Sequence, residues 1–350
     1  MIFASDNWAG AHPMIAENLV RHAAGFASAY GTSDLDRAVE RSFCDLFERE
    51  VAVFFVGTGT AANALSMTTL ARPGGVFFAH RDAHMVVDEC GAVEYLSGGG
   101  RLCPVDGPLG RITPQALQAA IDRYPPAFVH AGQPAAVSIT QATETGTVYG
   151  ADDIAAIADT ARRNGLALHM DGARFANALV SLGLTPAEMT WKRGVDVVSF
   201  GGTKNGCWCA EAVVIMNPES ARDFPFIRKR AAQLFSKSRF VAAQFGTYFR
   251  DGLWLETAGH ANAMAQRLAA HVEASPHARL GWQPQANEVF PLVRREAVEK
   301  LEAAGAVFKR WHVLPEEVAG DAHEDEVLLR LVTGFATTPD AVDRFGDLLA

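Results

Sequence analysis

Three stretches of this 350-residue chain carry side chains whose types and spacing could do chemistry. The first is the turn at residues 57–63, Gly-Thr-Gly-Thr-Ala-Ala-Asn, which follows an apolar run at residues 51–56 and opens a helical pattern. Backbone N–H groups and hydroxyls of such a turn lie at the N-terminus of a helix, where an anion is stabilised. The turn therefore predicts a bound phosphate group.

The same turn has two other interpretations. Gly57, Gly59 and Ala62 fit the dinucleotide-binding fingerprint, and Asp82 lies at the distance of about 20 residues where an acid binds the ribose. Alternatively, the glycines serve only the tight geometry of a strand-to-helix turn. The motif alone does not decide among the three roles.

The second stretch is an apolar strand pattern at residues 166–170 that ends in Asp171, Gly172, Ala173 and Arg174. Ligands of open α/β sheets bind at the carboxyl ends of the strands, so this acid and this arginine are placed for function. In the alternative interpretation, Asp171 caps the following helix and Arg174 is its solvated partner.

The third stretch places Lys204 among glycines, directly after an apolar run at residues 195–200. A lysine in a weakly polar, glycine-rich setting is suited to Schiff-base chemistry, although most lysines after strands are merely solvated.

The order of the three stretches indicates an enzyme that holds pyridoxal phosphate. Lys204 would form the Schiff base with the cofactor, and Asp171 would keep its pyridine nitrogen protonated so that the ring can accept electrons. His84 follows an apolar run at residues 76–79 and would supply a flat side chain over the ring. Taken singly, it could equally be a surface histidine.

With these residues in order, the chain resembles the pyridoxal-phosphate-dependent L-threonine aldolases of the aspartate-aminotransferase fold. The matching residues run nearly from end to end: Ser5, Asp6 and Asn7; Tyr30 and Gly31; Gly59, Thr60 and Asn63; Ala83 and His84; residues 169–174; Lys204; Arg239; and residues 329–333.

The resemblance implies a role for each matching residue in binding the cofactor. Gly59 and Thr60 hold the phosphate, His84 stacks on the ring, Asp171 pairs with the pyridinium, and Lys204 is the Schiff-base lysine. These roles come from the family and are expectations for this chain.

The resemblance also implies how the substrate and a second subunit are bound. Arg174 contacts the cofactor's phenolic oxygen or the substrate, and Ser5, Arg174 and Arg330 grip the substrate carboxylate. Arg239 reaches the phosphate of a neighbouring subunit, so a homodimer or homotetramer is expected.

One departure from the family concerns the general base. Many members carry a histidine where this chain has Glu144, within residues 141–146, and the chain looks closer to the low-specificity branch, which accepts threonine and allo-threonine. We expect His84 to take the proton of the β-hydroxyl, because imidazole is suited to proton transfer near neutral pH. Nothing in the sequence around Glu144 predicts the burial that a basic carboxylate needs, so we expect it to orient a water or a neighbouring side chain.

The elements that must position these residues form an α/β pattern. Apolar runs alternate with helical patterns at residues 60–70, 114–123 and 151–164, which predicts a mostly parallel sheet covered on both faces. The expected strands are residues 51–56, 76–79, 101–105, 127–131, 166–170, 195–200 and 212–216. With the resemblance, this is pyridoxal-phosphate-dependent fold type I.

The C-terminal part of the chain has a different pattern. A long Ala-rich helix at residues 259–274, two short strands within residues 276–291 and a helix at residues 294–304 predict a smaller α+β domain. We therefore expect a large cofactor-binding domain with an N-terminal arm at residues 1–245 and a small domain at residues 246–350.

Composition limits the partners. Hydrophobic residues make up 49% and charged residues 20%, which is ordinary for a folded globular protein. The net charge of −9 with scattered basic residues argues against nucleic acid, and apolar runs are too short to span a membrane. An acidic start without a signal-peptide pattern favours the cytoplasm, and five cysteines without metal-binding spacing are expected to be reduced core thiols, with no metal site.

The leading hypothesis is a lyase that splits a β-hydroxy-α-amino acid into glycine and an aldehyde. A β-eliminating lyase of the same fold is the close alternative, and it would release pyruvate and ammonia instead. A nicotinamide-dependent oxidoreductase would use the literal fingerprint but leaves Lys204 and Asp171 without a role. A non-catalytic binding protein on the same scaffold is disfavoured because Lys204, Asp171, Arg174 and Arg330 are all present.

Overall fold

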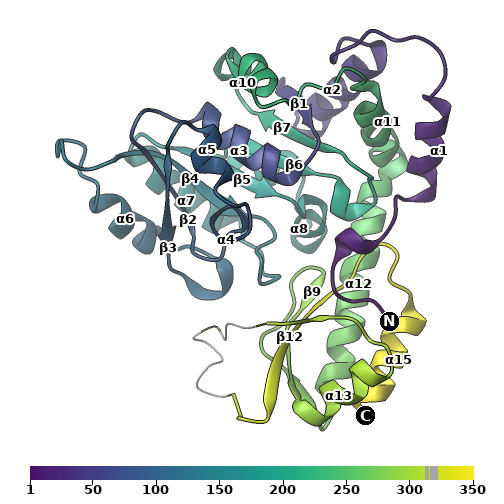
Figure 1. Cartoon of the computed structure of the whole chain (residues 1–350). Helices are drawn as coiled ribbons and strands as arrows, with labels where there is room; N and C mark the ends of the chain where they lie inside the picture. The colour runs from purple at the N-terminus through teal and green to yellow at the C-terminus, as the bar shows by residue number, and fades with distance from the viewer. Residues whose placement is uncertain (312–314, 316–321) are drawn as a thin grey trace.

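The computed structural model describes residues 1–311, 315 and 322–350 of the chain. Figure 1 shows a large part built on a central sheet and a smaller part that contains the C-terminal strands, with the long helix α12 (Leu253–Ala274) running through both. The N-terminus lies beside the smaller part in this view.

The large sheet has seven strands in the order β1-β7-β6-β5-β4-β2-β3. Strands β2 to β6 pair in parallel, whereas β7 runs antiparallel to both of its neighbours. The strands are β1 (Ala52–Val56), β2 (Gly75–His80), β3 (Arg101–Val105), β4 (Gln133–Thr140), β5 (Ala167–Gly172), β6 (Val197–Gly201) and β7 (Glu211–Ile215). The predicted mostly parallel sheet is confirmed.

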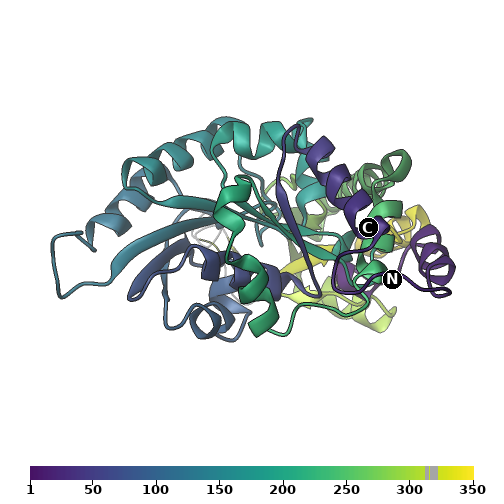
Figure 2. The same ribbon diagram turned by 90° about the horizontal axis from the view of Figure 1, so that it is seen from above.

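Both faces of the sheet are buried, because successive side chains of each strand enter different cores. On β2, Val76 and Phe78 pack in one core, whereas Phe77 and Ala79 pack in another. Continuous apolar strands of this kind need helices on both faces, as Figure 2 shows from above.

One set of helices covers each face. The first face carries α3 (Gly59–Thr69), α5 (Ala92–Leu96) and α10 (Phe224–Arg230). The second carries α2 (Asp34–Leu46), α6 (Pro114–Asp122), α7 (Ala151–Arg163), α8 (Phe175–Leu182) and α11 (Arg239–Tyr248). The predicted helices correspond to α3, α6 and α7, with ends that differ by one residue.

The remaining short elements connect these layers. They are α1 (Pro13–Arg21), α4 (His84–Val87), α9 (Pro186–Met189) and the 3-10 turns η1 (Asp6–Trp8), η2 (Pro108–Gly110), η3 (Trp191–Arg193), η4 (Thr203–Asn205), η5 (Pro218–Ala221) and η6 (Arg250–Gly252).

One predicted strand is wrong. Residues 127–131 form turns in which Phe128 and Val129 are exposed, and the strand is β4, which begins at Gln133. Pairing explains the shift, because β4 lies beside β5 from Ala136 opposite Ala167 to Thr140 opposite Asp171. A strand at residues 127–131 would end before residues 136–140, which are the residues that pair with β5.

The smaller part is an antiparallel sheet backed by helices. Its strands β8 (Ala278–Leu280), β10 (Pro291–Arg294), β12 (Glu326–Val332) and β11 (Lys309–Arg310) lie side by side, and β9 (Glu288–Val289) pairs with β12. Helices α12, α13 (Arg295–Ala303) and α15 (Pro339–Leu349) pack on it, and Phe3 from the N-terminal segment joins their core.

The expected division at residue 245 falls inside α11. The long helix begins at Leu253, earlier than the predicted residue 259, and it contacts α8 of the large part as well as α15 and β8. Among the described residues, no helix is long and apolar enough to cross a membrane.

The cysteines are only partly as predicted. All five are free thiols, but only Cys103 and Cys207 are buried in the core. Cys44 and Cys209 are half-buried, and Cys90 is exposed.

Candidate active site

A cavity of about 270 Å³ opens where the carboxyl ends of β5 and β6 face the N-terminus of α3. This volume is close to the lower limit for small-molecule binding sites, which is about 300 Å³. Its walls come from segments far apart in sequence: Asn7, Gly57, Thr58, Gly59, Thr60, Asn63, His84, Glu89, Asp171, Ala173, Thr203, Lys204 and Glu211. The structure therefore brings together the three stretches singled out from the sequence.

The glycine turn forms one end of this cavity. Helix α3 begins at Gly59, and the hydroxyl of Thr58 caps it by accepting a hydrogen bond from the N–H of Ala61 at 3.1 Å. The first N–H groups of a helix have no partner within it, so this end of the cavity attracts an anion. A side chain at Gly57 would lie 2.8 Å from the ring of Phe235, which explains the glycine.

Asp171 is the last residue but one of β5, and its carboxylate is held from two sides. Its Oδ1 accepts a hydrogen bond from the N–H of Ala173 at 3.0 Å, and its Oδ2 accepts one from Asn63 Nδ2 at 2.8 Å. The following helix α8 has Arg174 at its N-cap and no side-chain cap. The alternative in which Asp171 caps that helix is therefore wrong.

Lys204 lies in η4, in the connection that follows β6, and is half-buried. Phe200 anchors β6 by edge-to-face packing on Phe43 and Phe245, with ring centroids 5.1 and 6.0 Å away. Each buried phenylalanine contributes about 1.5–3 kcal/mol, so the strand that leads to Lys204 is rigidly held. After Phe200, a Cβ atom at Gly201 would lie 2.6 Å from the carbonyl oxygen of Ala173, so only glycine fits at this position.

Glu211 is a buried acid on the same wall, at the start of β7. Its Oε1 accepts a hydrogen bond from the N–H of Thr203 at 3.2 Å. Burial raises the pKa of Glu211 to about 7, although Thr203 and Lys204 oppose the shift. The sequence analysis missed this residue.

His84 begins α4 and lines the cavity with about a third of its side chain exposed. Its Nδ1 lies 2.9 Å from Oε1 of Glu89, which is completely buried. That hydrogen bond is the main reason why the pKa of His84 is raised above its ordinary value, and burial opposes it. A histidine held in this way is not the loose surface residue of the alternative interpretation.

Arg174 is buried and does not pair with Asp171. Its Nε donates to Asp6 Oδ2 at 2.8 Å, and its Nη2 lies 3.4 Å from Glu288 Oε1. The alternative in which Arg174 is a solvated partner of Asp171 is therefore wrong as well. Burial alone would raise the pKa of Asp6, but Arg174 and Lys204 bring it below its ordinary value.

Arg330 joins the same cluster through Glu288, whose Oε1 also accepts a hydrogen bond from Arg330 Nη2. The structure thus brings two of the three residues expected at the substrate carboxylate to one buried acid. Ser5 lies beside Asp6 but lines a neighbouring hollow, and its Oγ accepts from the N–H of Asn7 at 3.1 Å.

Glu144 lies in the turn after β4 and is half-buried. The hydroxyls of neighbouring threonines fix this turn, with Thr143 Oγ1 2.8 Å from Thr147 Oγ1 and Thr145 donating to the carbonyl of Leu109 at 2.7 Å. The charge of Glu144 raises the pKa of His84, after the contribution of Glu89. Glu144 itself does not line the Lys204 cavity.

Arg239 lies apart from the Lys204 cavity and from the Arg174 cluster within a single chain. It begins α11, its Nη1 donates to the carbonyl of Gly25 at 3.1 Å, and it lines a surface hollow that includes Phe26. None of the residues at this hollow lines the Lys204 cavity.

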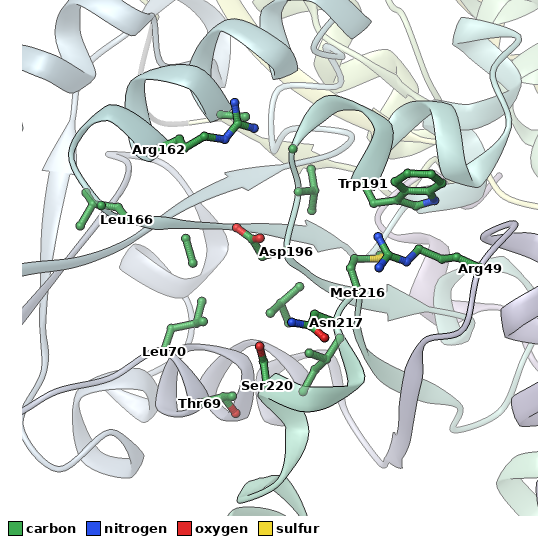
Figure 3. Close-up of a pocket in the computed structure, with 17 residues that line it drawn as sticks. Arg49, Thr69, Leu70, Arg162, Leu166, Trp191, Asp196, Met216, Asn217 and Ser220 are labelled. Atoms are coloured by element: carbon green, nitrogen blue, oxygen red, sulfur yellow. The ribbon is translucent and has the colours of Figure 1, made fainter.

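A larger cavity of about 550 Å³ lies at the opposite edge of the sheet, where β5 and β6 begin. Figure 3 shows Arg162, Trp191 and Asp196 around it. Asp196 uses its carboxylate to accept from the N–H of Leu168 at 2.9 Å, which ties the start of β5 to β6. Ligands of such sheets bind at the other edge, so we assign the function to the smaller cavity.

The sequence analysis missed four acids at this site: Asp6 as a partner of Arg174, together with Glu89, Glu211 and Glu288. Asp6 was noticed only as part of a matching segment. The other three stand in no motif, and Glu89 and Glu211 also lie outside every predicted strand and helix, so the sequence offered no signal for them. Within the described residues, no group of three or more His, Cys, Asp or Glu side chains is arranged to hold a metal ion.

Comparison with known proteins agrees with this geometry. The profile of the family described as Beta-eliminating lyase matches residues 3–295. The low specificity L-threonine aldolases of a Pseudomonas species and of Pseudomonas aeruginosa are each 41% identical to this chain over 304 residues, which are 87% of either sequence. The solved structure of Leishmania major threonine aldolase superposes with a TM-score of 0.91 at 27% identity, covering 99% of this chain and 98% of that one.

Proposed function

The chain belongs to the beta-eliminating lyase family, and from this premise we propose that it splits L-threonine, L-allo-threonine and related β-hydroxy-α-amino acids into glycine and an aldehyde. The observation that carries the proposal is the cavity that joins Lys204, Asp171 and the N-terminus of α3. An amine, an acid for a ring nitrogen and a phosphate site are what a pyridoxal-phosphate enzyme of fold type I requires.

The residues of the cavity fit pyridoxal phosphate. When bound, the cofactor supplies an aldehyde that captures amines and a ring that delocalises electrons from the α-carbon. The N–H groups of Gly59 and Thr60 would hold its phosphate, and the carboxylate of Asp171 would accept a hydrogen bond from its ring nitrogen. Asn63 Oδ1 and Glu89 Oε2 are buried without a hydrogen-bond partner among the described residues, so this wall still has capacity for a polar group.

Lys204 and His84 would complete the cofactor site. Lys204 would supply the amine that holds the cofactor through its aldehyde. His84 would cover one face of the ring, and its contact with Glu89 limits rotation of the imidazole.

The cationic cluster would bind the carboxylate of the substrate. Arg330 and Arg174 present planar guanidinium groups, which suit two-point binding of a carboxylate and thereby set the orientation of the α-carbon. Ser5 would add a hydroxyl from the neighbouring hollow. Because Glu288 already contacts both arginines, the substrate must share or replace that contact.

The proton of the β-hydroxyl would go to His84. Its Nδ1 is engaged by Glu89, which leaves Nε2 for the substrate. Glu144 would orient a water or a neighbouring side chain, in keeping with its half-buried position. A general base of this kind contributes about 10²- to 10⁴-fold in rate.

A second subunit would complete the site through Arg239. The hollow beside Arg239 includes Phe26, which is fully exposed in the single chain, and Val20 nearby in the sequence is 74% exposed. A homodimer or homotetramer that covers this hollow would bury these apolar side chains. Each subunit would consist of a large domain at residues 1–245 and a small domain at residues 246–350.

The alternatives receive less support. A β-eliminating lyase would use the same cofactor residues, but the relatives at 41% identity are threonine aldolases. The nicotinamide hypothesis requires Asp82 at the ligand, whereas Asp82 is outside the lining of the cavity and Lys204 and Asp171 are inside it.

The test combines spectroscopy with product analysis. The purified protein should show visible absorbance that borohydride bleaches, and it should release acetaldehyde and glycine from L-threonine. Pyruvate and ammonia in place of acetaldehyde would select the β-eliminating lyase. A colourless protein that binds nicotinamide cofactors would overturn the proposal.

A further inference from the structure

Glu89 is a buried acid to which the proposed function gives no chemical task. Its side chain is completely shielded from solvent, and Oε1 receives both polar contacts that the structure gives this carboxylate. Asn63 Nδ2 donates to it at 2.8 Å and His84 Nδ1 lies 2.9 Å away. An unpaired buried carboxylate is costly, so an acid in this position needs such partners.

The contact with His84 determines where the histidine carries its proton. An ionised carboxylate only accepts hydrogen bonds, so Nδ1 of His84 must be the donor. The other nitrogen, Nε2, is then the atom that can take a proton from a bound molecule. A histidine whose second nitrogen is held by a carboxylate is the arrangement in which catalytic imidazoles are kept in one tautomer.

We propose that Glu89 is the positioning residue for His84, which it holds in the Nδ1–H tautomer and stabilises in the protonated state that follows proton transfer. The inference rests on the proposed function, because it assigns the base of that reaction a partner. Glu89 does not touch the substrate, and it acts through the imidazole.

Other charges around the pair are consistent with this role. The pKa of His84 is raised chiefly by Glu89 and further by Glu144, whereas burial and Lys204 lower it. Burial raises the pKa of Glu89, which His84 and Asn63 oppose and Asp171 reinforces. The contact with His84 therefore helps to keep Glu89 ionised among the acids of this site.

Asn63 connects the pair to the rest of the cavity. The same amide nitrogen donates to Glu89 Oε1 and to Asp171 Oδ2, at 2.8 Å in both cases. One side chain thus holds the acid beside the imidazole and the acid expected at the ring nitrogen. Loss of Glu89 would disturb both, which is why the test must retain the shape of the side chain.

The variant Glu89→Gln retains an oxygen that can accept from His84 Nδ1 and from Asn63, but it removes the charge. The titration of His84 is followed by NMR in protein labelled at histidine, without cofactor, with His84→Phe to assign the signal. We expect the His84 transition to move to lower pH in Glu89→Gln. In the loaded enzyme, the acidic limb of the rate profile should move in the same direction. The value of kcat should fall on the order of tenfold to a hundredfold, the range known for carboxylates that orient metal-binding histidines.

Two further variants separate charge from shape. Asp88→Asn removes an exposed charge next to Glu89 and should leave the His84 titration unchanged. Glu89→Asp keeps the charge on a shorter side chain, so the His84 transition should stay near that of the parent. If Glu89→Gln does not fold, Glu89→Asp is the test in its place. Glu89→Ala, which lacks the carboxylate altogether, is the reference for complete loss of the charge. A His84 titration that is identical in parent and Glu89→Gln, or that moves in Glu89→Asp as far as in Glu89→Ala, would overturn the proposal.

The titration without cofactor does not depend on the reaction. If the parent protein failed to cleave threonine, the proposed function would fall while the His84 titration would still report on Glu89. If the parent cleaved threonine and the titration did not move, only the role of Glu89 would fall.

Discussion

Glu288 places its carboxylate 3.4 Å from the guanidinium of Arg174, and both side chains are buried. The same carboxylate binds Arg330. Burial raises the pKa of Glu288, and the two arginines oppose that shift. An internal acid thus occupies the cationic groups that we propose for the substrate carboxylate.

We expect Glu288→Gln to lower KM for L-threonine by about tenfold, which is about 1.4 kcal/mol. The reason is that a neutral amide competes less well than a carboxylate for Arg174 and Arg330. Steady-state kinetics measure the effect. Glu326→Gln, which removes the ion pair between Glu326 at the start of β12 and Arg279 on β8, is the control with unchanged KM. A higher KM in Glu288→Gln would show that Glu288 orients the arginines instead of competing for them.

Lys204→Ala should abolish multiple turnover and the visible absorbance, because no other lysine lines the cavity among the described residues. Absorption spectra before and after borohydride, together with acetaldehyde release, give the measurement. Lys192→Ala is the matched control, since Lys192 pairs with Glu48 at the surface and should retain both signals. Near-parental activity in Lys204→Ala would contradict the assignment.

The general base is tested by the pair His84→Phe and Glu144→Gln. His84→Phe keeps a flat ring but removes the basic nitrogen, and it should lower kcat by about 10²- to 10⁴-fold. Glu144→Gln keeps most of the hydrogen-bonding shape and should cost about tenfold, or about 1.4 kcal/mol. If the acidic limb of the pH–rate profile disappears in Glu144→Gln and persists in His84→Phe, the two roles are reversed.

Glu211 predicts a pH dependence of folding stability. Its pKa is about 7 in the folded protein because of burial, above the 4.5 of a free side chain, so the folded state holds the proton more tightly than the unfolded state. The stability contributed by Glu211 is therefore complete below pH 4.5 and is lost as the pH rises through about 7. The loss is up to about 3 kcal/mol at alkaline pH.

Glu211→Gln should remove this dependence while keeping an acceptor for the N–H of Thr203. Thermal unfolding of the cofactor-free protein at about pH 5 and about pH 8 measures it, and the variant should gain Tm relative to the parent at the higher pH. If the change in Tm from about pH 5 to about pH 8 were the same in the parent and in Glu211→Gln, Glu211 would not be the titrating group.

Much of the large sheet could be predicted from the sequence. Continuous apolar runs such as residues 76–79 are buried on both faces of the sheet. A run of this kind can be recognised from neighbouring residues in the sequence alone. The failure at residues 127–131 has a physical reason: an apolar run can form a strand, but pairing with β5 decides which residues do so.

The residues of the candidate site could be named in the same way when they end a predicted strand or begin a helix. Asp171, Lys204 and the turn at residues 57–63 meet because parallel strands end at one edge of the sheet, so their proximity follows from the fold class. Their roles remain predictions that the variants above address.

The sequence by itself determined the layers of this protein and the edge of the sheet at which its reactive side chains gather. Only the tertiary structure decided the pairing of the charges: Arg174 with Asp6, 168 positions away, and Arg330 with Glu288, 42 positions away. Helical or strand periodicity records whether a side chain is buried, whereas a buried charge is stabilised by whichever opposite charge or donor the folded chain brings within about 4 Å. That choice depends on contacts between distant segments, and these exist only once the chain has folded.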